Sequence, residues 1–131
     1  MQCPVSPPAT GNDTSSRFWQ ELEEKLADYC GVKHAISCSS GTDALLLSLR
    51  AMGIGPGDEV IVPNLTFAST ASSVFHAGAH PVLCDIDPRT WCISPDSLRS
   101  VVTSRTKAII PVHLYGQPVK NFDKLVQKLD Q

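Results

Sequence analysis

The stretch Cys38-Ser39-Ser40-Gly41-Thr42-Asp43-Ala44-Leu45-Leu46-Leu47 decides the fold of this chain. A strand-like run, His34 to Cys38, precedes it, and an apolar helix without an evident cap follows from Ala44 to Met52. The pattern therefore predicts a strand, a tight turn of small residues and a helix start. The first N–H groups of a helix have no partner within it, and the helix dipole lies behind them, so they attract anions. The turn is a candidate phosphate-binding site, although glycine turns between strand and helix also occur for purely steric reasons.

Composition limits the class of protein. With 131 residues, of which 42% are hydrophobic and 18% are charged, the chain is typical of one globular domain. A net charge of -2 without clustered Lys and Arg argues against nucleic acid or an anionic membrane as a partner. The longest apolar run, residues 44–49, is too short to span a bilayer, and the N-terminus has no signal-peptide pattern. We therefore expect a cytoplasmic protein with no membrane partner.

The cysteines and histidines do not indicate a metal site. The cysteines are odd in number and lack the paired spacing of zinc or redox sites, so we expect reduced and mostly buried thiols. They are Cys3, Cys30, Cys38, Cys84 and Cys92. His76 and His80 are four residues apart, but Gly78 lies between them and Pro81 follows, which disfavours a continuous helix that would carry both as ligands.

The N-terminal part of the chain is predicted to contain one amphipathic helix. Residues 1–15 are rich in Pro, Ser and Thr, and we expect a disordered tail there. A helix is predicted from Ser16 to near Gly31, and its apolar face is expected to pack on a core. That face carries Phe18, Leu22, Leu26 and Tyr29.

Strands and helices alternate along the rest of the chain. Strands are predicted at 34–38, 59–62, 81–84 and 107–113, and helices at 44–52, at 68–77, from Ser94, and from Asn121 with apolar residues at 122, 125, 126 and 129. Such alternation is typical of an α/β fold, a mostly parallel sheet with helices on both faces. Ligands then bind beyond the carboxyl ends of the strands, here at loops 39–42, 63–67, 85–87 and 113–117. Backbone donors, an aromatic ring, an imidazole and a phenol on these loops suit a planar phosphorylated ligand.

Five motifs in one order and spacing resemble a known family. They read GVKHA at 31–35, SGTDAL at 40–45, GIGPGDEVIVP at 53–63, TFASTA at 66–71 and KAIIPVHLYGQ at 107–117. Together they closely resemble the DegT/DnrJ/StrS family, from about Phe18 to about Leu129. Its members are pyridoxal 5'-phosphate-dependent aminotransferases of fold type I, commonly homodimers, that act mostly on nucleotide-linked keto sugars. The resemblance implies that residues 16–131 are the N-terminal part of the cofactor-binding large domain, incomplete at its C-terminal end.

The resemblance also implies which residues bind the cofactor. The turn of Ser40, Gly41 and Thr42 matches the family's cup for the cofactor phosphate, which acts mainly through the amides of Gly41 and Thr42. Phe67 matches the aromatic residue that stacks on the pyridine ring, where a flat apolar face holds the cofactor without competing for its polar edges. The alternative for Phe67 is an ordinary core residue.

Two further loops match the family without a chemical role. His113 and Tyr115 match a family loop near the active site, where ordinary hydrogen bonding accounts for them. Asp85 and Asp87 follow a strand end, but the family's partner for the pyridine nitrogen comes from a later strand. We therefore interpret both aspartates as structural.

The family needs two residues that no position here matches. Transamination requires a lysine that binds the cofactor covalently and a carboxylate that keeps the pyridine nitrogen protonated. In the family both come after the part that this chain matches, so the resemblance implies no catalytic residue here and leaves open whether this chain alone is an enzyme. One interpretation is the N-terminal portion of an aminotransferase that moves an amino group from an amino acid to a nucleotide-linked keto sugar. The alternative is a catalytically inactive remnant or a phosphate-ligand-binding module; a general nucleotide-binding module is disfavoured because no Gly-x-Gly-x-x-Gly follows the first strand.

The resemblance also predicts how the strands pair. In fold type I the first strand pairs only with a strand that forms late in the chain. We therefore expect the run at 34–38 to lack a partner here, and the other three predicted strands to lie side by side. The fourth strand is expected to have an unpaired edge.

Overall fold

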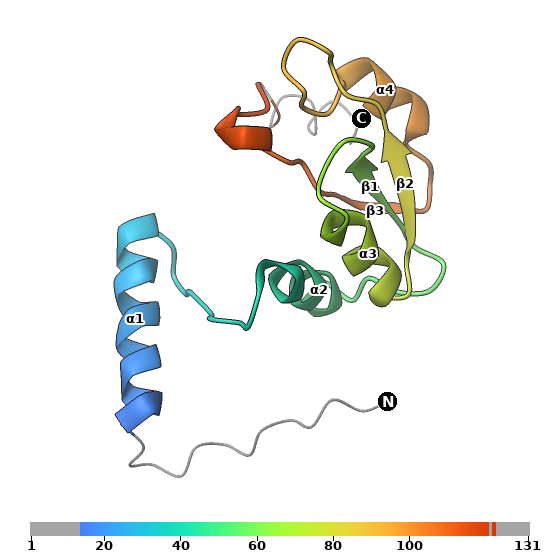
Figure 1. Ribbon diagram of the computed structural model, residues 1–131. Coiled ribbons are helices and arrows are strands. Elements are labelled where there is room, and N and C mark those ends of the chain that lie inside the picture. The colour runs from blue at the N-terminus through green and yellow to red at the C-terminus, as the bar shows by residue number, and fades with distance from the viewer. Residues whose placement is uncertain (1–13, 121, 123–131) are drawn as a thin grey trace. The chain divides into compact units, whose positions relative to one another are not determined.

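The computed structural model describes residues 14–120 and 122, and the chain divides into two compact units, residues 1–39 and 40–131 (Figure 1). The first unit contains helix α1, Thr14–Cys30, which begins slightly before the predicted start at Ser16. Of the tail predicted over residues 1–15, Thr14 and Ser15 belong to α1 instead, and residues 1–13 lie outside the described residues. So does the predicted last helix, apart from Phe122.

Helix α1 ends where the sequence predicted, at a glycine. Gly31 has a φ of 64°, which a residue without a Cβ adopts at little cost. The N–H of Val32 donates to the carbonyl of Ala27 at 3.0 Å, and the N–H of Gly31 donates to Asp28 at 3.2 Å. This pair of bonds is the Schellman motif, which satisfies carbonyls of the last turn.

The apolar face of α1 was predicted to pack on a core, but most of it is exposed. Phe18 is 63% exposed and Tyr29 is 89% exposed, whereas Ala27 is buried. The ring of Phe18 contacts Trp19 edge to face, with centroids 5.8 Å apart. The bonds that end the helix are local and do not require a core, whereas burial of its apolar face does.

The predicted strand at residues 34–38 does not form. This segment is irregular, and Ile36 is 85% exposed. Within it, the backbone N–H and the hydroxyl of Ser37 both donate to the carboxylate of Glu23 at 2.6 Å. The Ser37 hydroxyl bond, followed by the Ser37 backbone bond, lowers the pKa of Glu23. Among the described residues no strand pairs with this segment, which agrees with the expectation that its partner forms elsewhere.

The second unit contains a three-stranded parallel sheet in the order β2-β1-β3. Its elements are α2 (Gly41–Ala51), β1 (Glu59–Pro63), α3 (Ser69–His76), β2 (His80–Cys84), α4 (Pro95–Val101), β3 (Thr106–Ile109) and the 3₁₀-helix η1 (Leu114–Gly116) (Figure 1). The predicted α/β class and the adjacency of these strands are confirmed. Strand β3 ends at Ile109, earlier than the predicted end at His113.

Strand β1 is the centre of the second unit. All five of its residues are buried, and alternate side chains point to opposite faces of the sheet. Val60 and Val62 pack in a cluster with Leu49 of α2 and Val74 of α3. On the opposite face, Ile61 packs with Cys84, Ile93 and Leu98 in a second cluster that α4 covers. The sheet therefore has helices on both faces, as predicted.

The register of β2 against β1 is continuous, whereas that of β3 contains one bulge. In β2, Pro81 stands opposite Val60. In β3, Thr106 stands opposite Glu59 and Ala108 opposite Val60, so Lys107 forms a bulge. The bulge places Lys107 in solvent, while Ala108 and Ile109 face the same sides as their partners in β1.

The cysteine prediction is only half correct. Cys84 and Cys92 are buried, whereas Cys30 and Cys38 are exposed, and all four are thiols rather than disulfides. Cys3 lies outside the described residues. Burial of a cysteine follows from the element that carries it, and the two exposed ones lie at the end of α1 and in the irregular segment.

The two histidines lie on different elements, as predicted. His76 ends α3, His80 begins β2, and Gly78 with a φ of 87° separates them. Within residues 14–120 and 122, no group of three His, Cys, Asp or Glu side chains is placed to hold a metal ion. No helix of that same region is long and apolar enough to cross a membrane.

Candidate functional site

Ser40 begins helix α2 as its N-cap, which the sequence interpretation missed. Ser40 is extended, with a φ of -160° and a ψ of 164°, and its Oγ accepts from the N–H of Asp43 at 3.1 Å. The Ser40 hydroxyl in turn lies 3.0 Å from Oδ2 of Asp43, to which it donates. A serine followed three residues later by an acid was the available signal, since this spacing resembles a capping box.

This cap leaves the amides of Gly41 and Thr42 as the candidate anion donors of the turn. They are the first two residues of α2, where a helix supplies no carbonyl acceptor, and the helix dipole is positive there. Gly41 is exposed, and a Cβ placed on it would meet no atom within 4 Å, so an anion can approach the backbone closely. The donors fit a phosphate group. Ser40 caps the helix end, and its predicted contact with the cofactor stays a prediction.

Phe67 lies in the loop between β1 and α3 and is 78% exposed. The alternative interpretation of Phe67 as a core residue is therefore wrong. The loop is fixed on its α3 side by two contacts: the N–H of Thr70 donates to the Phe67 carbonyl at 3.0 Å, and the hydroxyls of Thr66 and Thr70 lie 3.1 Å apart. Its ring is accessible to a flat ligand, and the stacking role stays a prediction.

The carboxyl ends of β1 and β2 are joined by Asn64, a residue that the sequence interpretation did not select. The N–H of Asn64 donates to the carbonyl of Cys84 at 2.9 Å, and its side-chain Nδ2 donates to Oδ1 of Asp85 at 2.6 Å. The N–H of Asp85 donates to Oγ of Ser97 at 2.8 Å. An asparagine that directly follows the proline at the end of β1 was the only sequence signal.

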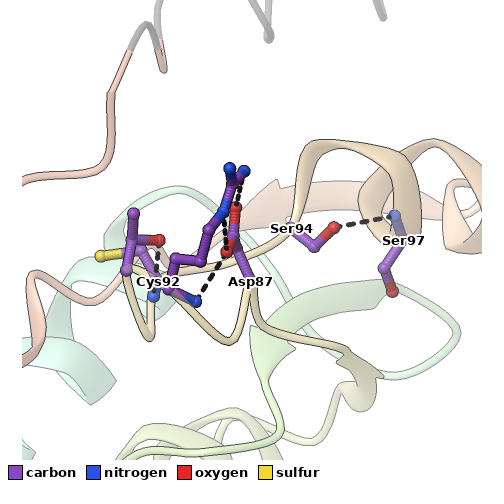
Figure 2. Close-up of polar contacts among 6 residues, drawn as sticks. Asp87, Cys92, Ser94 and Ser97 are labelled. Carbon is purple, nitrogen blue, oxygen red and sulfur yellow. Dashed lines mark hydrogen bonds and ion pairs between the residues drawn. The ribbon is translucent and has the colours of Figure 1, made fainter.

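Asp87 closes the turn of a short hairpin, as its structural interpretation requires (Figure 2). Its Oδ1 accepts from the N–H of Arg89 at 2.8 Å, and its Oδ2 lies 3.2 Å from the Arg89 guanidinium. The guanidinium hydrogen bond, followed by the backbone bond, lowers the pKa of Asp87. The same figure shows the cap of α4, where Oγ of Ser94 accepts from the N–H of Ser97 at 3.5 Å.

His113 and Tyr115 lie on the loop after β3. Nδ1 of His113 accepts from the N–H of Val119 at 3.1 Å, which is the ordinary hydrogen bonding expected for it. Tyr115 is 91% exposed and has a φ of 53°, a strained backbone conformation for a residue other than glycine. The thiol of Cys92 donates to the Gln117 carbonyl at 3.3 Å and fixes the end of this loop.

A buried carboxylate lies at the amino end of β1, at the opposite edge of the sheet. Glu59 has a side chain only 5% exposed and binds the Thr103 hydroxyl and the Arg105 guanidinium, whose Nε lies 2.9 Å from Oε1. The pKa of Glu59 lies below its usual value, mainly because of the hydrogen bond from Thr103. The hydrogen bond and positive charge of Arg105 act in the same direction, and burial opposes them. His80 adds a smaller effect in the same direction.

Comparison with known proteins identifies the family. Residues 9–130 match the family described as the DegT/DnrJ/EryC1/StrS aminotransferase family. The chain is 62% identical over 101 residues to GDP-perosamine synthase of Caulobacter vibrioides, covering 77% of this chain and 27% of that protein. It is 57% identical over 97 residues to UDP-2-acetamido-2-deoxy-3-oxo-D-glucuronate aminotransferase of Pseudomonas aeruginosa, covering 74% of this chain and 27% of that protein. The chain thus spans about a quarter of the length of the curated relatives it matches.

A solved structure agrees with the sequence comparison. NtdA of Bacillus subtilis with bound cofactor PMP is 39% identical with a TM-score of 0.80, and the match covers 86% of this chain and 26% of that one. Pyridoxal phosphate, of which PMP is the amine form, is the cofactor of these enzymes. The fold is part of the fold-type-I large domain. From these matches, this chain belongs to the DegT/DnrJ/EryC1/StrS aminotransferase family.

Proposed function

We propose that this chain is the N-terminal part of the cofactor-binding domain of a pyridoxal-phosphate-dependent aminotransferase, spanning residues 16–131. The proposed reaction moves an amino group from an amino acid to a nucleotide-linked keto sugar. Two relatives support this substrate class, since their names state a GDP-sugar product and a UDP-linked oxo-sugar substrate. By resemblance we further propose a homodimer that works in the cytoplasm.

The observation that carries the proposal is the start of α2. The amides of Gly41 and Thr42 have no acceptor within the helix, the surface above Gly41 is open, and Ser40 holds the helix end in place. A dianionic phosphate gains charge-assisted hydrogen bonds from such amides and a favourable interaction with the helix dipole. We assign these two amides, with Ser40 as their support, to the cofactor phosphate.

Phe67 supplies the second contact. Its ring is exposed on the loop after β1, in the same unit as α2. An aromatic face excludes water from one side of a pyridine ring and orients the ring by stacking. The cofactor, when bound, supplies an electron sink that stabilises charge at the carbon bearing the amino group. The residues of this chain bind and orient the cofactor, and we assign no proton transfer to them.

The test removes one amide without removing the helix. Gly41→Pro deletes the N–H at the first helical position, where proline is favoured, and the extended Ser40 before it suits a following proline. We expect the Kd values for pyridoxal phosphate and for inorganic phosphate to rise about tenfold, since a hydrogen bond to a charged group is lost. Titration followed by absorbance and by calorimetry measures both values, and circular dichroism checks that the helix is kept.

The matched control is Gly41→Ala, which keeps the N–H and adds a methyl group that meets no neighbouring atom. It should bind more tightly than Gly41→Pro. Equal binding by Gly41→Pro and the unsubstituted protein would contradict the proposed phosphate site. Binding of inorganic phosphate with no gain in affinity for the pyridoxal compound would favour the alternative, a phosphate-ligand-binding module.

A further inference from the structure

The loop that carries Phe67 is fixed by hydrogen bonds rather than by packing. Its residues Leu65 and Phe67 are 42% and 78% exposed, so apolar burial does not decide where the ring lies. On the side of α3, the Phe67 carbonyl and the Thr66 hydroxyl both contact Thr70, which is itself buried. On the side of β1, the corresponding anchor is Asn64.

Asn64 is bound by its backbone and by its side chain to the neighbouring strand. The backbone bond to Cys84 extends the β1–β2 ladder one step beyond Pro63, and the side-chain bond reaches the next residue, Asp85. A carboxylate only accepts hydrogen bonds, so the amide nitrogen of Asn64 must face it. At 2.6 Å the contact is a short, charge-assisted bond.

Asp85 is in turn held from the opposite side. Its N–H donates to Oγ of Ser97 at 2.8 Å, and its carbonyl accepts from the N–H of Ser94 at 2.8 Å. These two bonds fix its backbone to the start of α4 and leave the carboxylate directed at Asn64. A chain of contacts therefore runs from α4 through Asp85 and Asn64 to the loop of Phe67.

We propose that Asn64 and Asp85 form a positioning pair that sets where the Phe67 ring stands to receive the planar ring of the cofactor. This inference rests on the proposed function, because it assigns Phe67 to the cofactor ring. Asn64 and Asp85 act through the backbone of the loop and touch no reacting atom. The inference changes the interpretation of Asp85 from a purely structural residue to one that supports the site.

The experiment uses the whole gene product and first measures the loop without any ligand. In Asn64→Ala the backbone bond to Cys84 remains and only the bond to Asp85 is lost. The Thr70 amide reports on the loop, because its acceptor is the Phe67 carbonyl. We expect its hydrogen exchange, measured by NMR, to become about fivefold faster, which corresponds to the net strength of one hydrogen bond.

The second measurement uses the cofactor itself. We expect the Kd of Asn64→Ala for pyridoxal phosphate to rise about fivefold while its Kd for inorganic phosphate stays unchanged. The visible circular dichroism of the bound cofactor should change as well, since it depends on how the ring is held. A loss of general stability would weaken both ligands together, so the contrast between them isolates the position of the ring.

Conservative variants complete the design. Asp85→Asn keeps an acceptor oxygen for Asn64 and should stay close to the unsubstituted protein, whereas Asp85→Ala should match Asn64→Ala, and the double variant should add nothing further. Asp87→Asn is the matched control, because Asp87 binds Arg89 in the neighbouring turn. It should leave both the Thr70 exchange rate and the cofactor affinity unchanged.

Two contrary outcomes are distinguishable. If the unsubstituted protein binds pyridoxal phosphate and Asn64→Ala binds it equally well with unchanged Thr70 exchange, the positioning pair is overturned and the proposed function stands. If the unsubstituted protein does not bind pyridoxal phosphate, the proposed function fails, and the positioning pair is overturned with it.

Discussion

The two ends of strand β1 are built in opposite ways. At the amino end, the Glu59 carboxylate is 5% exposed and is bound by Thr103 and Arg105. At the carboxyl end, Asn64 and Asp85 form an exposed hydrogen bond, and Phe67, three residues after Asn64, is 78% exposed. Between these ends the strand is entirely buried.

This difference between the two ends of β1 indicates that the amino end serves stability and that the carboxyl end is suited to ligand binding. A buried carboxylate must be satisfied by protein donors, because it has lost its water, so the amino end is complete as it stands. An exposed aromatic ring gains from being covered by a ligand, and the polar Asn64–Asp85 pair already satisfies part of its hydrogen bonding. The carboxyl end is therefore where we expect a ligand, because ligands of other parallel sheets bind at this end of the strands.

The largest expected effect comes from the buried centre between the two ends. Ile61 is fully buried against α4, and Ile61→Ala should lower the free energy of unfolding by about 3 kcal/mol, the usual result of removing core methyl groups. Urea unfolding followed by circular dichroism measures this. A loss below about 1 kcal/mol would show that the sheet is not the stabilising core.

A pH titration of Glu59→Gln distinguishes the amino end from the carboxyl end. Because folding lowers the pKa of Glu59, the stability that its carboxylate contributes is fully present above the ordinary carboxyl pKa of about 4.3. It is lost as pH falls through the lowered pKa. We expect the unsubstituted protein to exceed Glu59→Gln in urea midpoint at pH 7 and the two to converge in acid. Cofactor affinity should not change, since this end is remote from the loop of Phe67. A constant difference down to pH 3 would contradict the assignment.

The smallest expected effect concerns an exposed ion pair on α4. Arg99 lies 3.0 Å from Asp96, whose side chain is 94% exposed, so Arg99→Ala should change the free energy of unfolding by less than about 0.5 kcal/mol. Arg105→Ala is the matched comparison, because it removes the same type of side chain from the buried Glu59. Equal effects of the two variants would show that burial at the amino end has no energetic importance.

Local signals in the sequence predicted the elements well. The apolar run closed by Pro63 gave β1, Gly31 marked the end of α1, and Ser94 with Pro95 marked the start of α4. Each of these is decided within a few residues by backbone geometry or by burial on both faces. The start of α2 is an exception, because the helix was predicted from Ala44 and the structure begins it at Gly41 after the Ser40 cap.

Features that depend on distant partners were predicted less well. The run at 34–38 has the composition of a strand, but a strand requires a neighbour, and Ile36 remains exposed. The prediction that Phe18 and Cys38 are buried was wrong for the same reason, because a side chain is buried only where it has a surface to pack against. Asn64 was missed because its importance depends on Asp85, which only the fold brings near.

Pro81 of β2 and the Lys107 bulge of β3 also bear on how the edges of the described sheet can pair. An outer strand invites the strand of another molecule to pair with it, which is the first step of side-by-side polymerisation. Pro81 in β2 has no N–H that could donate to a strand of another molecule. The bulge at the charged Lys107 interrupts the regular edge of β3. Within the sheet of the described residues, β2 and β3 thus each carry a residue that disfavours regular pairing with a strand of another molecule.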